Sequence, residues 1–280
     1  MYKNGKPNYN ERVFTQEQLE DIKELYLSGV SSVKIGKIYG IDHKPILRAL
    51  HKMNVDVCQK RLVRKYALDE HYFDNIDTQE KAYIFGFLLA DGHNEVKKST
   101  IQMSLQEEDR YILECMRTEL KSGKPLEFID YSNKHDLGYT YKNQYRLEVF
   151  SKDMCLKLKE HGMIESKSSK LVFPNCIPDD LLSHFVRGYF DGNGTINVKS
   201  GGVTILSTNK FCESLRVKLN ELLGLEYGYC TESSNHNGIT YDLRYGRKKE
   251  AKAILDWMYA DAHLYLERKY KKYEQLYLLK

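Results

Sequence analysis

Two polar residues, Asp91 and Asn193, each follow a mainly apolar stretch of the chain and each precede a glycine. An aspartate presents carboxylate oxygens and an asparagine presents an amide oxygen, and hard cations prefer oxygen ligands. The asparagine, however, brings no charge. If the fold brings these two residues to one point, they would therefore form a cation site with a single acidic group.

The spacing of small residues before them predicts helices that pack closely. Gly86 and Ala90 are four positions apart and therefore lie on one face of the first expected helix. Gly188 and Gly192 repeat this spacing in the second. Small residues on a shared face let two helices approach each other closely. We therefore expect a helix pair with these four residues at its interface and with its two polar ends side by side.

Start signals precede both expected helices. Asp77 or Thr78 is the expected N-cap of the first, and Glu80 would complete a capping box. Pro178, which two aspartates follow, marks the start of the second. The offset between the two patterns is constant from their first small residue to their last glycine. It is too long for a solenoid repeat and indicates two similar subdomains.

These stretches resemble a known motif. GFLLADG at residues 86–92 and RGYFDGNG at residues 187–194 are similar to the two copies of the LAGLIDADG motif of homing endonucleases. The flanking sequences KAYIFGFLLADG, IPDDLLSHFVRGYFDGNG and YLERKYKKYEQL fit the same family, and the resemblance covers residues 66–280. The alternative, a pair of ordinary core helices, does not explain the two polar ends.

The resemblance implies an α+β fold with two pseudo-symmetric αββαββα repeats, whose two antiparallel sheets form a saddle over DNA. Alternating apolar and polar residues support this order of elements. The expected strands lie around residues 93–105, 125–150, 195–207 and 226–245, and the helices between them around residues 106–121 and 210–223.

Residues 14–53 have the pattern of three short helices. Their expected N-caps are Thr15, Ser31 or Ser32, and Asp42. The third helix carries a basic face of Lys44, Arg48 and Lys52. The sequence SVKIGKIYGIDHKPILRAL resembles the helix-turn-helix of the resolvase and invertase type, which implies DNA binding. The alternative is a small helical bundle whose lysines only solvate its surface.

The chain therefore divides into four expected parts. They are a helix-turn-helix domain at residues 1–58, a linker at residues 59–76, a first LAGLIDADG repeat at residues 77–172 and a second at residues 173–280. The first part is all-α.

Composition bounds the compartment and the partners. The 280 residues carry a net charge of only +4, so nucleic-acid binding must depend on where the basic residues lie. The chain has neither a signal peptide nor an apolar run long enough for a membrane span, which predicts a cytoplasmic protein without a membrane partner. Its six cysteines form no C-x-x-C pair, which argues against zinc. We expect a bacterial or phage-encoded gene.

The third helix and the polar strand faces carry the side chains that we expect to contact DNA. Arg and Gln can read base edges, and Lys and Arg neutralise phosphates. These residues are Lys44, Arg48, Lys52, Lys97, Lys98, Gln102, Lys142, Arg146, Lys199, Arg244 and Arg247. For any one of them, an ordinary solvent-facing position is the alternative.

The resemblance also implies a metal site, with one acid at the foot of each motif helix. Mg²⁺ would support phosphodiester hydrolysis there, Mn²⁺ could replace it, and Ca²⁺ would be a non-activating substitute. Asp91 fills the first position, and Asn193 stands where the family has Asp or Glu. The backbone carbonyls of Ala90 and Gly192 would complete the ligands. Three interpretations follow: impaired cleavage, cleavage of one strand only, or a binding variant whose exchanged acid traps a complex.

A basic partner in each half is implied as well. The sequence HGMIESKS matches the family loop that carries it in the first half, which gives Lys167, with Lys170 as the alternative. In the second half, LERKY gives Lys269. Each would polarise water or stabilise the charged transition state. An ordinary surface lysine is the other interpretation of each.

These features together predict a monomeric, site-specific homing endonuclease that cleaves double-stranded DNA at a long, non-palindromic site and serves intron homing. A DNA-binding regulator that does not cleave is one alternative, which Asn193 favours. An RNA splicing cofactor is another, although the deep groove of A-form RNA excludes a recognition helix.

Overall fold

The computed structural model describes residues 2–3, 6–7, 14–55, 57, 65–132, 135–136, 139–165, 169–235 and 238–278. The chain forms two compact units, Met1–Lys65 and Tyr66–Lys280. Among the described residues, no helix is both long and apolar enough to cross a membrane.

The first unit is a small bundle of three helices. They are α1 (Gln16–Leu27), α2 (Ser32–Ile38) and α3 (His43–Lys52), and a short pair of strands, β1 (Tyr2–Lys3) and β2 (Lys6–Pro7), precedes them. Ile22, Ile35, Ile46 and Leu50 form its buried core. The side chains of Thr15, Ser31 and Asp42 cap the three helices, as the sequence predicts.

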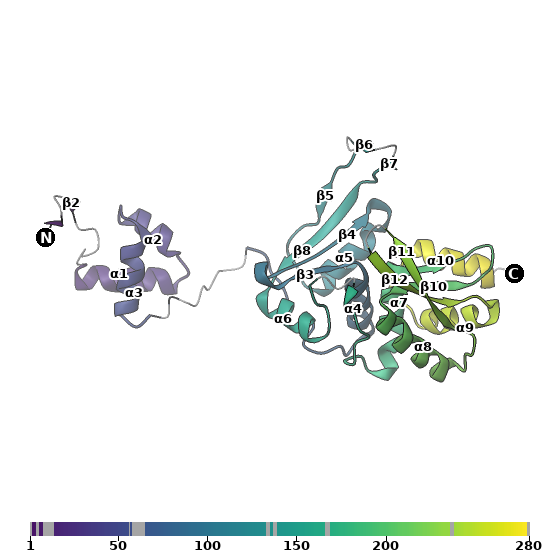
Figure 1. The fold of residues 1–280 in the computed structure, drawn as a ribbon. Coiled ribbons are helices and arrows are strands. Elements are labelled where there is room, and N and C mark those ends of the chain that lie inside the picture. The colour runs from purple at the N-terminus through teal and green to yellow at the C-terminus, as the bar shows by residue number, and fades with distance from the viewer. Residues whose placement is uncertain are drawn as a thin grey trace. The chain divides into compact units, whose positions relative to one another are not determined.

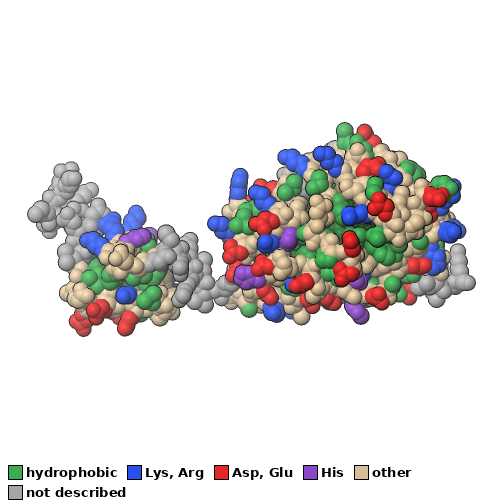
Figure 2. All heavy atoms as spheres, turned by 90° about the horizontal axis from the view of Figure 1, so that it is seen from below, with side chains coloured by type: hydrophobic (Ala, Val, Ile, Leu, Met, Phe, Trp, Pro, Cys, Tyr) green, Lys and Arg blue, Asp and Glu red, His purple; other side chains and the backbone are tan. Residues whose placement is uncertain are grey.

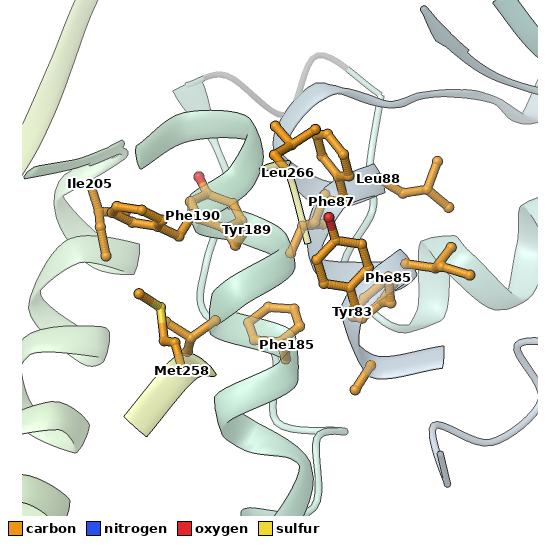
Figure 3. Packing of buried hydrophobic residues seen from close by; sticks show 14 of the residues in the cluster. Tyr83, Phe85, Phe87, Leu88, Phe185, Tyr189, Phe190, Ile205, Met258 and Leu266 are labelled. Atoms are coloured by element: carbon orange, nitrogen blue, oxygen red, sulfur yellow. The ribbon is translucent and has the colours of Figure 1, made fainter. Parts of the chain in front are cut away.

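The second unit is built around two motif helices, α4 (Gln79–Asp91) and α7 (Leu182–Asn193). Their backbones touch. A Cβ built on Gly86 would overlap the carbonyl oxygen of Phe185, and one built on Gly188 would overlap the carbonyl oxygen of Tyr83. Phenyl rings on both helices surround this contact, with Phe85 and Phe185 centred 5.7 Å apart (Figure 3). Glycine is needed here because it alone leaves room for the partner backbone.

One antiparallel sheet and two helices complete the first half (Figure 1). The sheet order is β3-β4-β8-β5. Its strands are β3 (His93–Glu95), β4 (Thr100–Gln106), β8 (Gln144–Phe150) and β5 (Glu127–Ile129). The helices α5 (Arg110–Glu119) and α6 (Lys152–Glu160) pack against it. The 3-10 turns η2 (Val96–Lys98) and η3 (Glu107–Asp109) and the strand pair β6 (His135–Asp136) and β7 (Tyr139–Thr140) lie between these elements.

The second half repeats this order. Its sheet order is β11-β12-β10-β9, again antiparallel. The strands are β9 (Gly194–Ile196), β10 (Val203–Ser207), β11 (Tyr229–Asn235) and β12 (Gly238–Tyr245), and the helices are α8 (Asn209–Leu223) and α9 (Lys248–Tyr259). A 3-10 turn, η5 (Asp179–Leu181), precedes α7, and α10 (Glu267–Tyr273) and the π-helix η6 (Glu274–Leu278) end the described chain. The predicted α+β fold with two αββαββα units is confirmed.

Each sheet buries one face under its helices. In β4, Ile101, Met103 and Leu105 are buried, whereas Gln102 and Ser104 on the opposite face are only half-buried. This alternation is typical of a sheet with one face in the core. The polar face of each sheet is therefore available to a partner.

Three local features differ from the sequence predictions. The strand expected at residues 93–105 is two strands, because Ser99 adopts a left-handed conformation (φ 56°) that reverses the chain. Thr78, one of the two predicted N-caps, caps α4 by accepting from the amide of Lys81, so Glu80 does not stand at the position that completes a capping box, and Asp77 pairs with the Lys81 ammonium. Part of the expected linker at residues 59–76 belongs to the second unit, because Phe73 packs against Phe85 in its core.

Candidate active site

Asp91 is the last residue of α4, and its side chain is exposed. The end of α7 lies directly against it. A Cβ built on Gly192 would overlap the Cβ of Ala90 and would lie 3.2 Å from the carboxylate of Asp91. The fold thus brings Ala90, Asp91 and Gly192 together, and Gly192 leaves the room for this approach.

Asn193 is the last residue of α7 and is half-buried. Its side-chain Nδ2 donates to the hydroxyl of Tyr189 at 3.2 Å. That hydroxyl in turn donates to Oγ of Ser207 at 2.7 Å. Because Nδ2 is held by Tyr189, Oδ1 is the Asn193 side-chain atom that can serve a cation. Sequence reasoning missed Tyr189 and Ser207, since both read as ordinary core positions.

Lys269 lies in α10 and reaches the end of α7. Its side chain is only 5% exposed, and Nζ donates to the carbonyl oxygens of Phe190 at 2.6 Å, Asp191 at 2.7 Å and Gly194 at 2.7 Å. An ammonium group has three N–H bonds, so these carbonyls engage all of them. Burial lowers the pKa of Lys269 to about 8, although the nearby charges of Asp191 and Asp91 oppose this shift.

Asp191 faces the interior on the side of α7 away from Asn193. It is fully buried, and its Oδ2 accepts from the hydroxyl of Tyr83 and from the backbone amide of Leu266, each at 2.8 Å. Burial raises the pKa of Asp191, which Lys269 and the Leu266 amide partly offset. One signal was present in the sequence: Arg187 and Asp191 form a charged pair one helical turn apart within an otherwise buried helix.

Comparison with known proteins identifies the architecture. No protein-family model and no curated protein matches the chain. The solved structure of the homing endonuclease I-WcaI bound to its DNA recognition sequence is similar to 73% of this chain and 91% of that chain, with 14% identity and a TM-score of 0.50. The chain has the LAGLIDADG fold.

Two further solved structures with this fold are more distant in shape. The I-LtrWI LAGLIDADG homing endonuclease bound to target DNA matches over 75% of this chain and 90% of that chain, with 13% identity and a TM-score of 0.44. The N-terminal LAGLIDADG domain of DUF199/WhiA matches over 73% and 92%, with 17% identity and a TM-score of 0.43.

The C-terminal ends of α4 and α7 present oxygen atoms but few charged groups. Among the described residues, no group of three or more His, Cys, Asp or Glu side chains is placed to hold a metal ion. The donors present are the Asp91 carboxylate, the Asn193 amide oxygen and nearby backbone carbonyls. This set fits Mg²⁺, which usually binds one or two carboxylates and completes its shell with water and phosphate oxygens.

Three further basic residues belong to the first half of the second unit. Lys167 lies outside the described residues, and Lys170 is exposed. His93 follows Gly92 directly and is exposed, with its Nε2 3.9 Å from the carboxylate of Glu95.

Three of the predicted DNA contacts on the LAGLIDADG sheets lie beside acids. On the polar face of the first sheet, Gln102 donates to Glu148 at 2.6 Å, and Arg146 lies 3.7 Å from the carboxylate of Glu127. In the second sheet, Arg244 pairs with Asp242 at 2.7 Å. The other candidates are exposed in turns that border the strands, and they are Lys97, Lys98, Lys142, Lys199 and Arg247.

The first unit has a basic side. Lys44, Arg48 and Lys52 are all exposed on α3. Figure 2 shows most Lys and Arg side chains of this unit along one edge, with the Asp and Glu side chains gathered at the opposite edge. A surface with separated charges of this kind orients a protein on a polyanion.

Proposed function

We propose that this chain is a divalent-metal-dependent endonuclease that binds a long duplex DNA site and cleaves it at the paired ends of α4 and α7. One observation supports the proposal: the Asp91 carboxylate lies against Gly192, the neighbour of Asn193 in the chain, where α4 and α7 end and β3 and β9 begin. A homing role, which the family resemblance suggests, is part of the proposal.

The residues at this junction have distinct proposed roles. Asp91, the Oδ1 of Asn193 and the backbone carbonyls of Ala90 and Gly192 would hold the cation. A bound Mg²⁺ or Mn²⁺ supplies Lewis-acid chemistry at a scissile phosphate, and Ca²⁺ would bind without activating. Because Asn193 carries no charge, the site holds one carboxylate instead of two. We therefore propose slow cleavage, or cleavage of only one strand.

DNA would contact both units. In the second unit, the polar faces of the two sheets would present Gln102, Arg146 and Arg244, which lie on paired strands, to the grooves. In the first unit, α3 would act as the recognition helix of a helix-turn-helix and lengthen the bound site. The two halves of the second unit differ in sequence, so a single chain would recognise a non-palindromic site and would need no second copy.

A DNA-binding regulator without nuclease activity is the second candidate. Asn193 favours it, because this neutral residue stands at the end of α7, where the family resemblance implies an acid. The DNA-binding surfaces proposed above would serve this function equally well.

The test begins by selecting a target. The full chain is incubated in Ca²⁺ with a pool of random duplex DNA, and the sequence that it enriches is cloned into a supercoiled plasmid. In Mg²⁺, we expect the parent chain to nick the plasmid or to cut it slowly. Asn193→Asp should linearise the plasmid, and Asp91→Asn should be inactive.

Two outcomes contradict the nuclease proposal. If the parent and Asn193→Asp both bind the selected site and neither cuts it, the second candidate function, a DNA-binding regulator, is correct. If the chain enriches no duplex sequence, then sequence-specific DNA binding is wrong as well.

A further inference from the structure

Residues 264–269 are the end of the connection between α9 and α10 and the first residues of α10, and we call them the crosspiece because they contact both halves of the second unit. The first half holds the crosspiece through α5. The Tyr111 hydroxyl donates to the carbonyl of Tyr265 at 2.8 Å and accepts from the amide of Glu267 at 2.6 Å. Just before α5, the carboxylate of Asp109 accepts from Arg268 at 3.0 Å. The crosspiece is therefore fixed to a half of the fold that is distant in sequence.

The second half holds the same crosspiece through α7. Arg187 is 1% exposed and donates from Nε to the carbonyl of Leu264 at 2.9 Å. The Asp191 carboxylate accepts from the amide of Leu266, and Tyr83 of α4 donates to the same oxygen. Both LAGLIDADG helices thus contribute to one buried anchor.

Burying a carboxylate costs free energy of folding unless hydrogen bonds compensate it. Packing alone therefore does not explain an aspartate at position 191. The equivalent position of α4 is Leu89, which is 1% exposed. A buried apolar residue is therefore compatible with this position of a motif helix. Unlike a leucine, Asp191 can bond to the crosspiece: its carboxylate accepts a hydrogen bond from the backbone amide of Leu266.

Lys269, the last residue of the crosspiece, contacts the end of α7 beside the candidate active site. The three carbonyls that its ammonium binds belong to Phe190, Asp191 and Gly194, which flank Gly192 and Asn193 in the chain. A cation at a helix C-terminus stabilises the carbonyls that have no partner within the helix. The position of Lys269 therefore fixes the backbone on both sides of Asn193.

We propose that Asp191 is a positioning residue: by anchoring the crosspiece through Leu266, it holds Lys269 on the end of α7 and so keeps Asn193 beside Asp91. This inference rests on the proposed nuclease function only for its effect on cleavage. It assigns Lys269 to the backbone of α7 in place of direct contact with water or phosphate.

The test compares three full-length variants. Asp191→Asn removes the charge of the anchor and keeps its shape. Tyr83→Phe removes one hydrogen bond to the anchor. Tyr259→Phe is the matched control, because the buried Tyr259 hydroxyl has no hydrogen-bond partner among the described residues. Circular dichroism and thermal melting establish that each variant is folded.

Two measurements are made on each folded variant. The first is trace acetylation with acetic anhydride and mass spectrometry, which reports the reactivity of Lys269 relative to the exposed Lys199. The second is single-turnover cleavage of the selected DNA at saturating protein, together with the DNA dissociation constant. The cleavage series uses Asn193→Asp as the background if the parent cuts too slowly.

We expect Lys269 to be protected in the parent and in Tyr259→Phe, and to react several-fold faster in Asp191→Asn and Tyr83→Phe. In these two variants the single-turnover rate should fall about tenfold, because small displacements of positioned groups slow catalysis strongly, while DNA affinity stays unchanged. A role in stability alone would lower the melting temperature and leave the cleavage rate of the folded protein intact.

Unchanged Lys269 reactivity in folded Asp191→Asn and Tyr83→Phe would overturn the proposal. Increased reactivity without a change in cleavage rate would also overturn its functional part. If no chain cuts DNA, the nuclease function fails, and the acetylation result still decides whether Asp191 positions Lys269.

Discussion

Asp91 and Asn193 occupy equivalent ends of α4 and α7, yet only one of them carries a charge. Two neighbouring carboxylates repel each other unless a cation lies between them. At the proposed cation site, an uncharged residue 193 would therefore remove this repulsion and would also reduce the attraction for a metal. The amide of Asn193 would thus favour the stability of the metal-free protein over tight metal binding.

Asn193→Asp should reverse this balance. In EDTA we expect the variant to be destabilised by about 1 kcal/mol, which lowers the melting temperature by about 2–4 °C for a unit of this size. Ca²⁺ should raise the melting temperature of the variant more than that of the parent, because it binds the folded state more tightly. Thermal melts with and without Ca²⁺ measure both effects. Equal shifts in the two proteins would show that residue 193 does not contribute to a cation site.

His184 makes stability depend on pH. It is 5% exposed, and its Nδ1 lies 2.8 Å from a guanidinium nitrogen of Arg187. Burial, together with the charge of Arg187, lowers the pKa of His184 from 6.5 to about 4. Between these values the unfolded chain binds a proton that the folded chain does not. The free energy of unfolding should therefore fall as the pH falls from 6.5 to 4, by up to about 3 kcal/mol.

Urea unfolding of the second unit at several pH values between 7 and 4 tests this, with His184→Gln as the comparison. Glutamine can accept from Arg187 but does not titrate, so this variant should lose the part of the pH dependence that His184 contributes. Identical pH profiles for the two proteins would exclude His184 as the source.

At the scale of elements, the contact between α4 and α7 leaves no room for a side chain at its centre. Gly86→Ala or Gly188→Ala must push the two backbones apart, and we expect a loss of stability on the order of 3 kcal/mol. Gly246→Ala is the control, because a Cβ there meets nothing within 4 Å. Chemical denaturation of the three variants measures the difference. A cost at Gly86 no larger than at Gly246 would contradict the close approach.

The elements that local rules govern could be predicted from the sequence. The caps at Thr15 and Asp42 and the glycine spacing of the motif helices depend on residues near one another, and the structure confirms them. Gly92 shows a limit. Its φ of −73° suits any residue, and only the fold shows why glycine is needed there: a Cβ would lie 2.6 Å from the carbonyl oxygen of Leu88.

The anchor of the crosspiece could not be predicted, because it depends on contacts between distant segments. Asp191 accepts from Leu266, 75 residues away in the sequence, and Tyr111 accepts from Glu267, 156 residues away. In the sequence, LERKY marks Lys269 as a basic partner that would act on water or on the charged transition state, and nothing in it indicates a buried side chain. Only the fold shows that its side chain is buried and that its three protons go to carbonyl groups.

At the scale of the whole molecule, the two units predict separable contributions to DNA binding. Lys44→Ala or Lys52→Ala on α3 should weaken binding and reduce the salt dependence of the binding constant by about one phosphate contact each. The cleavage rate at saturating protein should not change, because the candidate active site lies in the other unit. Lys23→Ala on α1 is the control. Titrations of the selected DNA at several salt concentrations provide the test, and equal slopes for all chains would remove α3 from the interface.

The crosspiece also bears on how such a protein can be recombined. Each half has its own sheet and helices, which suggests that halves could be exchanged between relatives as modules. Arg268 and Asp109, however, belong to different halves, as do Tyr111 and Glu267. A hybrid made by joining halves from two parents would inherit one member of each pair from each parent. A hybrid built in this way would therefore require residues 109–111 and residues 264–269 to be transplanted together.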